Sequence, residues 1–206
     1  TSSRYLEGAI LVYLRNLGIV APDKKPKPKV AEDFQFAGAY VADPQKGKHD
    51  WVFDLDVTSM YPSVIMSLNI SPETKLGKLE EWEPEDFIRE VEKTYIIKDD
   101  NGTQVASMNY EDFKSYVTDN KISISANGVL YRNDKAGLIP AILSKWFDER
   151  VEYRKLAKKF GNDGNTERYE YFDRRQLIQK IMLNSLYGVL GLSVFRFYDI
   201  DNAEAT

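Results

Sequence analysis

Apolar residues at helical spacing predict three helices along the chain. In residues 4–17 they recur every three or four positions, which makes one face of a helix apolar. The same spacing predicts a long amphipathic helix over residues 140–160. After a turn over residues 161–165, a second helix over about 166–187 returns antiparallel to it. The pattern therefore predicts a long helical hairpin in the second half of the chain.

Shorter apolar runs predict β-strands. Residues 51–57 alternate in character, so that Asp54 and Asp56 share one face of a strand while the other face is apolar. Residues 128–132 and 137–139 are typical of the two strands of a hairpin. Helices and strands in separate stretches of the chain predict an α+β fold.

The remaining stretches give weaker signals. Pro62 at an early helical position predicts a helix that begins within residues 61–63. Two further helices are expected near residues 84–93 and 110–118, with a turn over 99–102. Residues 22–29 alternate proline with charged residues, which indicates an extended, solvated connector.

Composition narrows the classes of protein. The 206 residues are 43% hydrophobic and include no cysteine, which excludes disulfides and thiolate metal sites. No apolar run is long enough to span a membrane, and the N-terminus lacks a signal-peptide pattern. The first residue is not methionine, which suggests a processed or excised start.

Charge is distributed unevenly. The net charge of −4 argues against a chain that coats nucleic acid by bulk positive charge. Residues 80–120 are strongly acidic, whereas residues 132–180 carry an excess of Lys and Arg. A local cationic section suits a protein that binds phosphate in one place, and two solvated faces of opposite charge are the alternative interpretation.

The block from Asp56 to Ser63 is the first candidate site. A carboxylate at a strand end is more often a turn former than a metal ligand. Here it is followed by a turn and a helix start, where backbone amides bind phosphate oxygens, and by the ring of Tyr61. Mg²⁺ is held by one or two carboxylates together with substrate oxygens, which makes Asp56 a candidate ligand.

The helical hairpin carries the second candidate site. On its first helix Arg150, Arg154 and Lys158 lie one turn apart and form a cationic stripe, which on most helices is only a solvated face. The second helix aligns four residues on one stripe: Lys180, Asn184, Tyr187 and Gly188. Two antiparallel helices can bring both stripes over one anion, where converging cations offset the charge of a triphosphate.

Both blocks resemble motifs of the family B DNA polymerases. Asp56-Val57-Thr58-Ser59-Met60-Tyr61-Pro62-Ser63 is similar to motif A, and Lys180 to Gly188 is similar to motif B. The run Asn69 to Thr74 adds a likeness to the replicative polymerases of tailed phages. The resemblance implies part of a polymerase palm, a β-sheet with packed helices, joined to an antiparallel two-helix fingers hairpin. It covers roughly residues 34–75 and 128–202.

In motif A, the resemblance implies that Asp56 is a metal ligand, while the Val57 carbonyl lies on a second metal ion. Ser59 and Met60 would offer main-chain amides to the triphosphate, and Met60 stands where leucine is commoner in the family. Tyr61 would stack below the deoxyribose and exclude a 2′-hydroxyl. The motif spacing selects Asp56, and Asp54 is then a supporting hydrogen-bonded group.

In the hairpin, the resemblance implies that Arg150, Arg154 and Lys180 bind the triphosphate, although lysine is usual at position 154. Arg keeps the charge there but adds a planar fork, so its contact differs. Asn184 would contact the incoming nucleotide, and Tyr187 and Gly188 the minor-groove side of the nascent base pair. Phe36 replaces the tyrosine of a template-contacting segment in a short strand expected over 36–41.

The second metal-binding aspartate of motif C is missing. The later pair Asp199 and Asp201 follows motif B too closely, in a segment over 195–199 that resembles a return strand. We therefore expect a palm-and-fingers piece in three parts: residues 1–139 (partial palm), 140–187 (fingers hairpin) and 188–206 (return to the palm). It would be inactive by itself.

The implied reaction is transfer of a dNMP to a primer 3′-hydroxyl by a two-Mg²⁺ mechanism. The implied partners are primer–template DNA, dNTP and replication accessory proteins, with no membrane, in the cytoplasm (of a host, for a viral protein). One alternative is a non-catalytic nucleotide- or nucleic-acid-binding module derived from a polymerase. The other is an α+β domain whose stripes are surface charge.

Overall fold

A computed structural model describes residues 2–24 and 41–206 of the protein. Its helices and strands follow one another in this order: α1 (Ser2–Asn16), α2 (Met60–Leu68), β1 (Lys75–Leu79), α3 (Pro84–Ile88), β2 (Tyr95–Lys98), β3 (Gln104–Met108), α4 (Tyr110–Asp119), β4 (Ile122–Ile124), β5 (Val129–Arg132), α5 (Leu138–Asn162), α6 (Thr166–Leu190) and α7 (Ile200–Glu204). The chain is mixed helix and antiparallel sheet, so the predicted α+β class is confirmed.

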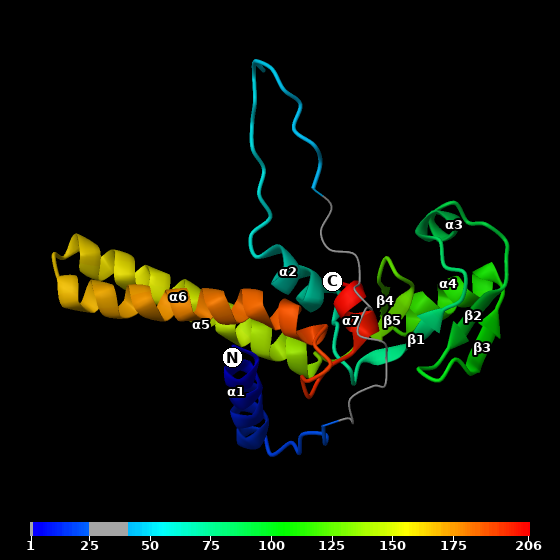
Figure 1. The fold of residues 1–206 in the computed structure, drawn as a ribbon. Coiled ribbons are helices and arrows are strands. Elements are labelled where there is room, and N and C mark those ends of the chain that lie inside the picture. The colour runs from blue at the N-terminus through cyan, green and yellow to red at the C-terminus, as the bar shows by residue number, and fades with distance from the viewer. Residues whose placement is uncertain (1, 25–40) are drawn as a thin grey trace.

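Helices α5 and α6 form the long hairpin that the apolar spacing predicts, and they project from the rest of the molecule (Figure 1). Each helix has 25 residues. Gly164 lies in the left-handed region at φ 69° in the turn, where a residue without a side chain is favoured. The Asn165 side chain then caps α6 by accepting a hydrogen bond from the Arg168 amide.

A five-stranded antiparallel sheet stands at the other end of the molecule, in the order β3-β2-β1-β5-β4 (Figure 1). Helix α4 packs on it through Tyr110 and Phe113, and the Phe113 ring stacks on Tyr95 at a centroid distance of 4.6 Å. This second core includes Leu79, Ile97, Ile122 and Leu130. The sequence predicted α4 and, over residues 128–132, the strand β5, but not the other four strands or their order.

The main core joins the base of the hairpin to α1, α2 and the C-terminal segment. Leu6, Ile10 and Leu14 of α1 are buried there, as their spacing predicts. Leu183 and Leu186 of α6 are buried in the same cluster. The base of the hairpin is therefore fixed, while its distal half extends away from the core (Figure 1).

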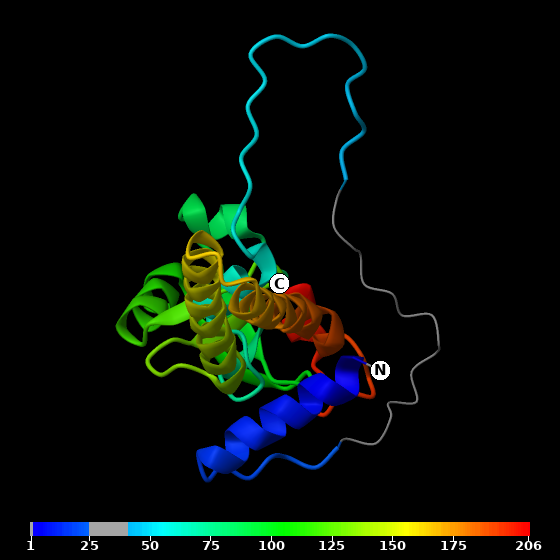
Figure 2. The ribbon, with the colours of Figure 1, turned by 90° about the vertical axis from the view of Figure 1, so that its left-hand side faces the viewer.

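The predicted strand over residues 51–57 is wrong. These residues lie in an arm that leads into α2 and projects from the molecule (Figures 1 and 2). Trp51 is 98% exposed, and Phe53 and Leu55 are also largely exposed. A strand needs neighbours for its backbone N–H and C=O groups, and in the described part of the chain no strand pairs with this arm.

Three other predictions need correction. Residues 137–139 are not a strand, because β5 pairs with β1 and β4 and residue 138 begins α5. Residues 195–199 form turns rather than a return strand. The helix expected over 84–93 ends at Ile88.

The helices around the candidate site agree with expectation, with α2 beginning at Met60 instead of within residues 61–63. The strand expected over 36–41, with Phe36, and part of the 22–29 connector lie outside the described residues. No helix in the described part of the chain is long and apolar enough to cross a membrane. The division at residues 139/140 and 187/188 stays a prediction.

Candidate nucleotide site

The turn that opens α2 has the backbone form of an anion site. Ser59 stands at the N-cap in the left-handed region, at φ 51° and ψ 52°, and Met60 begins the helix. The Ser63 amide donates to the Ser59 carbonyl at 2.9 Å, and its hydroxyl donates to the Thr58 carbonyl at 3.0 Å. A left-handed residue before a helical one turns successive N–H groups toward one point, and the helix dipole favours negative charge there.

Tyr61 and Tyr187 bring the two sequence motifs together. Their rings are stacked, with centroids 4.2 Å apart and planes 3° from parallel. Burial, and then the neighbouring Tyr61, raises the pKa of the Tyr187 phenol above its ordinary value. The first turn of α2 is therefore in direct contact with the end of α6. The two stacked tyrosines are more than a hundred residues apart in the sequence.

The motif B stripe lies on an open face of α6. Lys180, Asn184 and Gly188 are exposed, whereas Leu183 and Leu186 on the other side are buried in the main core. A Cβ added at Gly188 would meet no atom within 4 Å. These three residues of the stripe are therefore exposed, while Tyr187 is stacked on Tyr61, and their contact with a nucleotide stays a prediction.

The α5 cations differ in their surroundings. Arg150 is half-buried and Arg154 is exposed. Burial lowers the pKa of the Arg150 guanidinium, and the like charge of Arg154 lowers it further. The Arg150 Nε is buried and meets no hydrogen-bond acceptor among the described residues. An unsatisfied guanidinium beside a second cation favours an incoming anion.

A cleft of about 380 Å³ runs between the helices farther along the hairpin. Arg154 and Lys158 line it from α5, and Tyr169, Asp173 and Gln176 line it from α6. Lys180 does not line this cleft. Convergence of Lys180 with Arg150 and Arg154 over one anion therefore stays a prediction.

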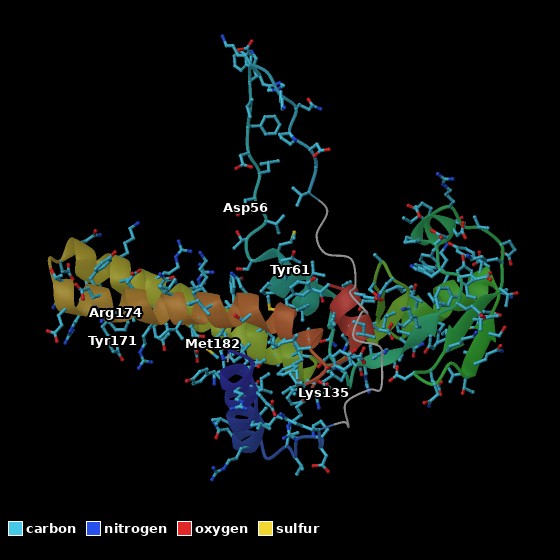
Figure 3. All side chains as sticks on the ribbon, viewed as in Figure 1. Asp56, Tyr61, Lys135, Tyr171, Arg174 and Met182 are labelled. Carbon is cyan, nitrogen blue, oxygen red and sulfur yellow. The ribbon has the colours of Figure 1, made fainter. Side chains whose placement is uncertain are left out.

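Asp56 lies in the exposed arm just before α2, on the same side of the hairpin as Tyr61 in the view of Figure 3. Tyr171, Arg174 and Met182 lie along the opposite edge of the hairpin in that view (Figure 3). The described residues contain no group of three or more carboxylate or imidazole side chains that could hold a metal ion. The assignment of Asp56 and the Val57 carbonyl as metal ligands therefore stays a prediction.

The later pair Asp199 and Asp201 is engaged in ion pairs. Lys75 Nζ lies 2.7 Å from Asp201 and 3.3 Å from Asp199, and Lys78 Nζ lies 2.7 Å from Asp201. Asp199 also caps α7 by accepting from the Asn202 amide at 3.1 Å. These carboxylates fasten the C-terminal segment to β1, which agrees with their exclusion from the metal set.

Sequence reasoning missed three side chains at the hairpin. Gln179 donates through Nε2 to Glu149, and its Oε1 is buried with no donor among the described residues. Gln176 and Asp173 line the cleft beside Arg154. The three-residue spacing of Asp173 and Gln176, which places both on the cleft side of α6, was the available signal in the sequence. It was easy to miss, because glutamine is uncharged and seldom marks a phosphate site.

Comparison with known proteins gives one family. A family model described as DNA polymerase family B matches residues 1–206. The DNA-directed DNA polymerases of Escherichia phage RB69 and Enterobacteria phage T4 are 25% and 27% identical, each over 82% of this chain and 22% of the relative. A DNA polymerase of Archaeoglobus fulgidus is 26% identical over 98% of this chain and 20% of the relative.

A solved polymerase structure also aligns with the whole chain. The family B DNA polymerase from the hyperthermophilic archaeon Pyrobaculum calidifontis matches with a TM-score of 0.62 and 28% identity, over 100% of this chain and 22% of that one. This chain thus spans about a fifth of the length of its relatives.

Proposed function

Since this chain belongs to DNA polymerase family B, we propose that it is the nucleotide-binding part of a DNA-directed DNA polymerase. It holds a deoxynucleoside triphosphate where α2 meets the base of the α5–α6 hairpin. The observation that carries the proposal is the stack of Tyr61 on Tyr187, because it joins the two motifs at one place.

Different residues of the chain bind different parts of the nucleotide. Arg150 and Arg154 on α5 and Lys180 on α6 offset the triphosphate charge. The Ser59 and Met60 amides bind phosphate oxygens at the start of α2. This arrangement fixes the α-phosphorus of the nucleotide relative to the incoming primer hydroxyl, which lowers the entropic part of the barrier.

The remaining contacts select the substrate. The Tyr61 ring lies below the deoxyribose and blocks a 2′-hydroxyl, and Tyr187 supports that ring from behind. Asn184 contacts the nucleotide, and Tyr187 and Gly188 face the minor groove of the new base pair. Primer–template DNA and dNTP are then the partners, with accessory replication proteins, in the cytoplasm (of a host, for a viral protein).

A divalent metal enters the proposal only as an expectation of the family. Mg²⁺ would supply charge neutralisation and an activated hydroxyl, with Asp56 and the Val57 carbonyl as ligands. Since the described residues bring no group of three or more carboxylates or imidazoles to Asp56, this chain by itself offers only part of the ligand set that two metal ions need.

Equilibrium binding tests the proposal. Calorimetry with dATP, ATP and the purified chain should give tighter binding of dATP, and Tyr61→Ala should remove that preference. Arg150→Ala and Lys180→Ala should each weaken dATP by about tenfold, as loss of one charge-assisted contact. Lys114→Ala is the matched control, because Lys114 pairs with Glu90 on the sheet end of the molecule. Equal binding of dATP by all these variants would remove the support for the site.

A non-catalytic nucleotide-binding module is the second candidate. It is favoured by the lack of a metal-binding cluster in the described part of the chain. Both candidates predict nucleotide binding and no primer extension by the purified chain. Extension with Mg²⁺ would contradict the expected inactivity and exclude the second candidate.

A further inference from the structure

Helix α5 takes its N-terminal cap from a distant turn. Its own N-cap residue, Gly137, has no side chain to accept from the first amides. Instead the Glu73 carboxylate accepts from the Leu138 amide, and the Ser71 hydroxyl oxygen accepts from the Ile139 amide at 3.3 Å. The Ser71 hydroxyl in turn donates to Glu73 at 2.8 Å. These partners lie 65 and 68 residues before the amides they cap.

The same turn is tied to the loop that leads into α5. Asn69, which follows α2 in the left-handed region, is buried and uses its whole amide. Its Nδ2 donates to the carbonyls of Arg132 at 2.7 Å and Lys135 at 2.9 Å, and its Oδ1 accepts from the Gly137 amide at 2.8 Å. The C-terminal end of α2 is thereby bonded to the N-terminal end of α5.

We call this set of residues, which follows α2 and bonds to the start of α5, the clamp: Asn69, Ser71, Glu73 and Thr74. The clamp is tightly packed. Thr74 closes the turn by donating to the Asn69 carbonyl at 2.6 Å. A Cβ added at Gly137 would lie 2.8 Å from the Ser71 Cβ and 2.9 Å from the Thr74 Cγ2, closer than side chains tolerate. The two helix ends therefore hold one fixed relation.

The two clamped helices carry different halves of the nucleotide site. Helix α2 carries Tyr61, the proposed sugar contact, and α5 carries Arg150 and Arg154, the proposed phosphate contacts. A ligand that touches both helices gains from a fixed angle between them, because its second contact is then already placed. A ligand that touches α5 alone gains nothing from that angle.

We propose that Glu73 is a positioning residue for the nucleotide. It touches no substrate, but by capping α5 from the turn after α2 it sets the phosphate-binding helix relative to the sugar-binding tyrosine. This inference rests on the proposed function. It predicts that Glu73 governs the coupling between sugar and phosphate binding instead of either contact by itself.

The test compares dATP with inorganic orthophosphate by calorimetry on the 206-residue chain, with no divalent metal added. Glu73→Ala should weaken dATP by about five- to tenfold, the size of a typical coupling between sites. As the comparison ligand, orthophosphate is preferable to tripolyphosphate, whose chain could also reach the Ser59 and Met60 amides at the start of α2. Orthophosphate affinity should stay within about twofold, because a single phosphate makes no sugar contact with Tyr61 and so does not depend on the angle between the helices. Glu73→Gln keeps an oxygen for the Leu138 amide and should restore most of the dATP affinity. Glu83→Ala is the matched control, since Glu83 precedes α3 and makes no side-chain cap.

A second measurement reads the helix angle without nucleotide. The chain has no cysteine, so a spin-labelled Ser67→Cys, Lys155→Cys pair reports the distance from α2 to the hairpin. Glu73→Ala and Gly137→Ala should both broaden that distance distribution, and Glu83→Ala should not. If Glu73→Ala fails to fold, Ser71→Ala carries the same comparison, because it removes the acceptor of the Ile139 amide.

The outcomes separate this inference from the proposed function. If the unaltered chain binds neither dATP nor orthophosphate, the proposed function fails and the role of Glu73 falls with it. If the chain binds both, but Glu73→Ala lowers both by the same factor or neither, Glu73 is only a structural cap and the inference is overturned. A selective loss of dATP with a broadened distance distribution supports it.

Discussion

Replacement of Lys75 by methionine should strongly destabilise the protein. The Lys75 side chain is only 7% exposed, and its Nζ lies within 2.7 Å of both Asp100 and Asp201 and 3.3 Å from Asp199. Asp199 is 11% exposed, so it would lose a cation without gaining full hydration. Removing one partner of a buried ion pair costs about 3–5 kcal/mol. Because Lys78 still pairs with Asp201, we expect a loss of about 2–4 kcal/mol.

Urea denaturation followed by circular dichroism measures this loss. Lys114→Met is the control, because Lys114 and Glu90 form an exposed pair, for which about 0–1 kcal/mol is expected. Asp201→Asn completes a double-mutant cycle with Lys75→Met and isolates the coupling of the pair. A Lys75→Met change as small as that of Lys114→Met would refute the conclusion that the cluster fastens the C-terminal segment to β1.

The same cluster sets a pH dependence. Burial acts to raise the pKa of Asp201, but hydrogen bonds from Lys75 and Lys78 outweigh it and leave the pKa below its ordinary value. Burial acts to lower the pKa of Lys75, but its carboxylate partners outweigh it and leave that pKa raised. The Asp201 contribution is therefore present above about pH 4 and lost as the pH falls further, and the Lys75 contribution is lost only in strong alkali. The stability difference between Lys75→Met and the unaltered chain should shrink below pH 4.

Three further predictions concern the site and the arm. Burial raises the pKa of Tyr95, Tyr131 and Tyr187 above the ordinary value of about 10, so spectrophotometric titration should show a late-ionising group of tyrosines. Tyr187→Phe should remove one tyrosine from that group, and an unchanged curve would contradict the buried stack. Gly188→Ala should raise the stability of the chain by up to about 1 kcal/mol, because alanine favours the helix more than glycine does and its Cβ would point into open space. The same change should weaken primer–template binding. Gly77→Ala should instead destabilise the chain by about 2 kcal/mol or more, since its Cβ would lie 2.7 Å from the Lys98 carbonyl oxygen. Changing Trp51, Phe53 and Leu55 to serine should leave the unfolding free energy within about 0.5 kcal/mol but reduce binding of a fluorescent apolar dye, and a large loss of stability would show that the arm is packed.

The long helices were predictable because their signal is local. A hairpin of two 25-residue helices repeats the apolar period many times, so the pattern survives single exceptions. The sheet was not predictable in the same way. Its strands are three to five residues long, and two of its pairings contain register shifts, so each strand offers only one or two alternations.

In the arm, the sequence pattern predicted a strand that the structure does not contain. Residues 51–57 have a clear strand pattern, yet a pattern specifies only which faces a strand would have and not which neighbour receives its hydrogen bonds. The candidate site shows the same difference between local features, which the sequence pattern predicts, and long-range contacts, which it does not. The exposure of Lys180 and Asn184 followed from the helical period, whereas the Tyr61–Tyr187 stack and the Glu73 cap each join residues far apart in the sequence. No local pattern contains such pairs.

Helix α2 is held at both ends, whereas the arm before it is not. The elements proposed to bind the nucleotide therefore differ in support from the residue expected to take part in catalysis. The first turn of α2 stacks on α6 through Tyr61 and Tyr187, and the turn after α2 is clamped to α5. The arm that carries Asp56, directly before α2, has no such support among the described residues. The elements proposed to bind the sugar and the phosphates are therefore preorganised, while the carboxylate expected to hold a metal is not. It follows that nucleotide affinity and sugar selection should be measurable in this chain without primer extension, and that supporting the arm would affect catalysis while leaving that affinity unchanged.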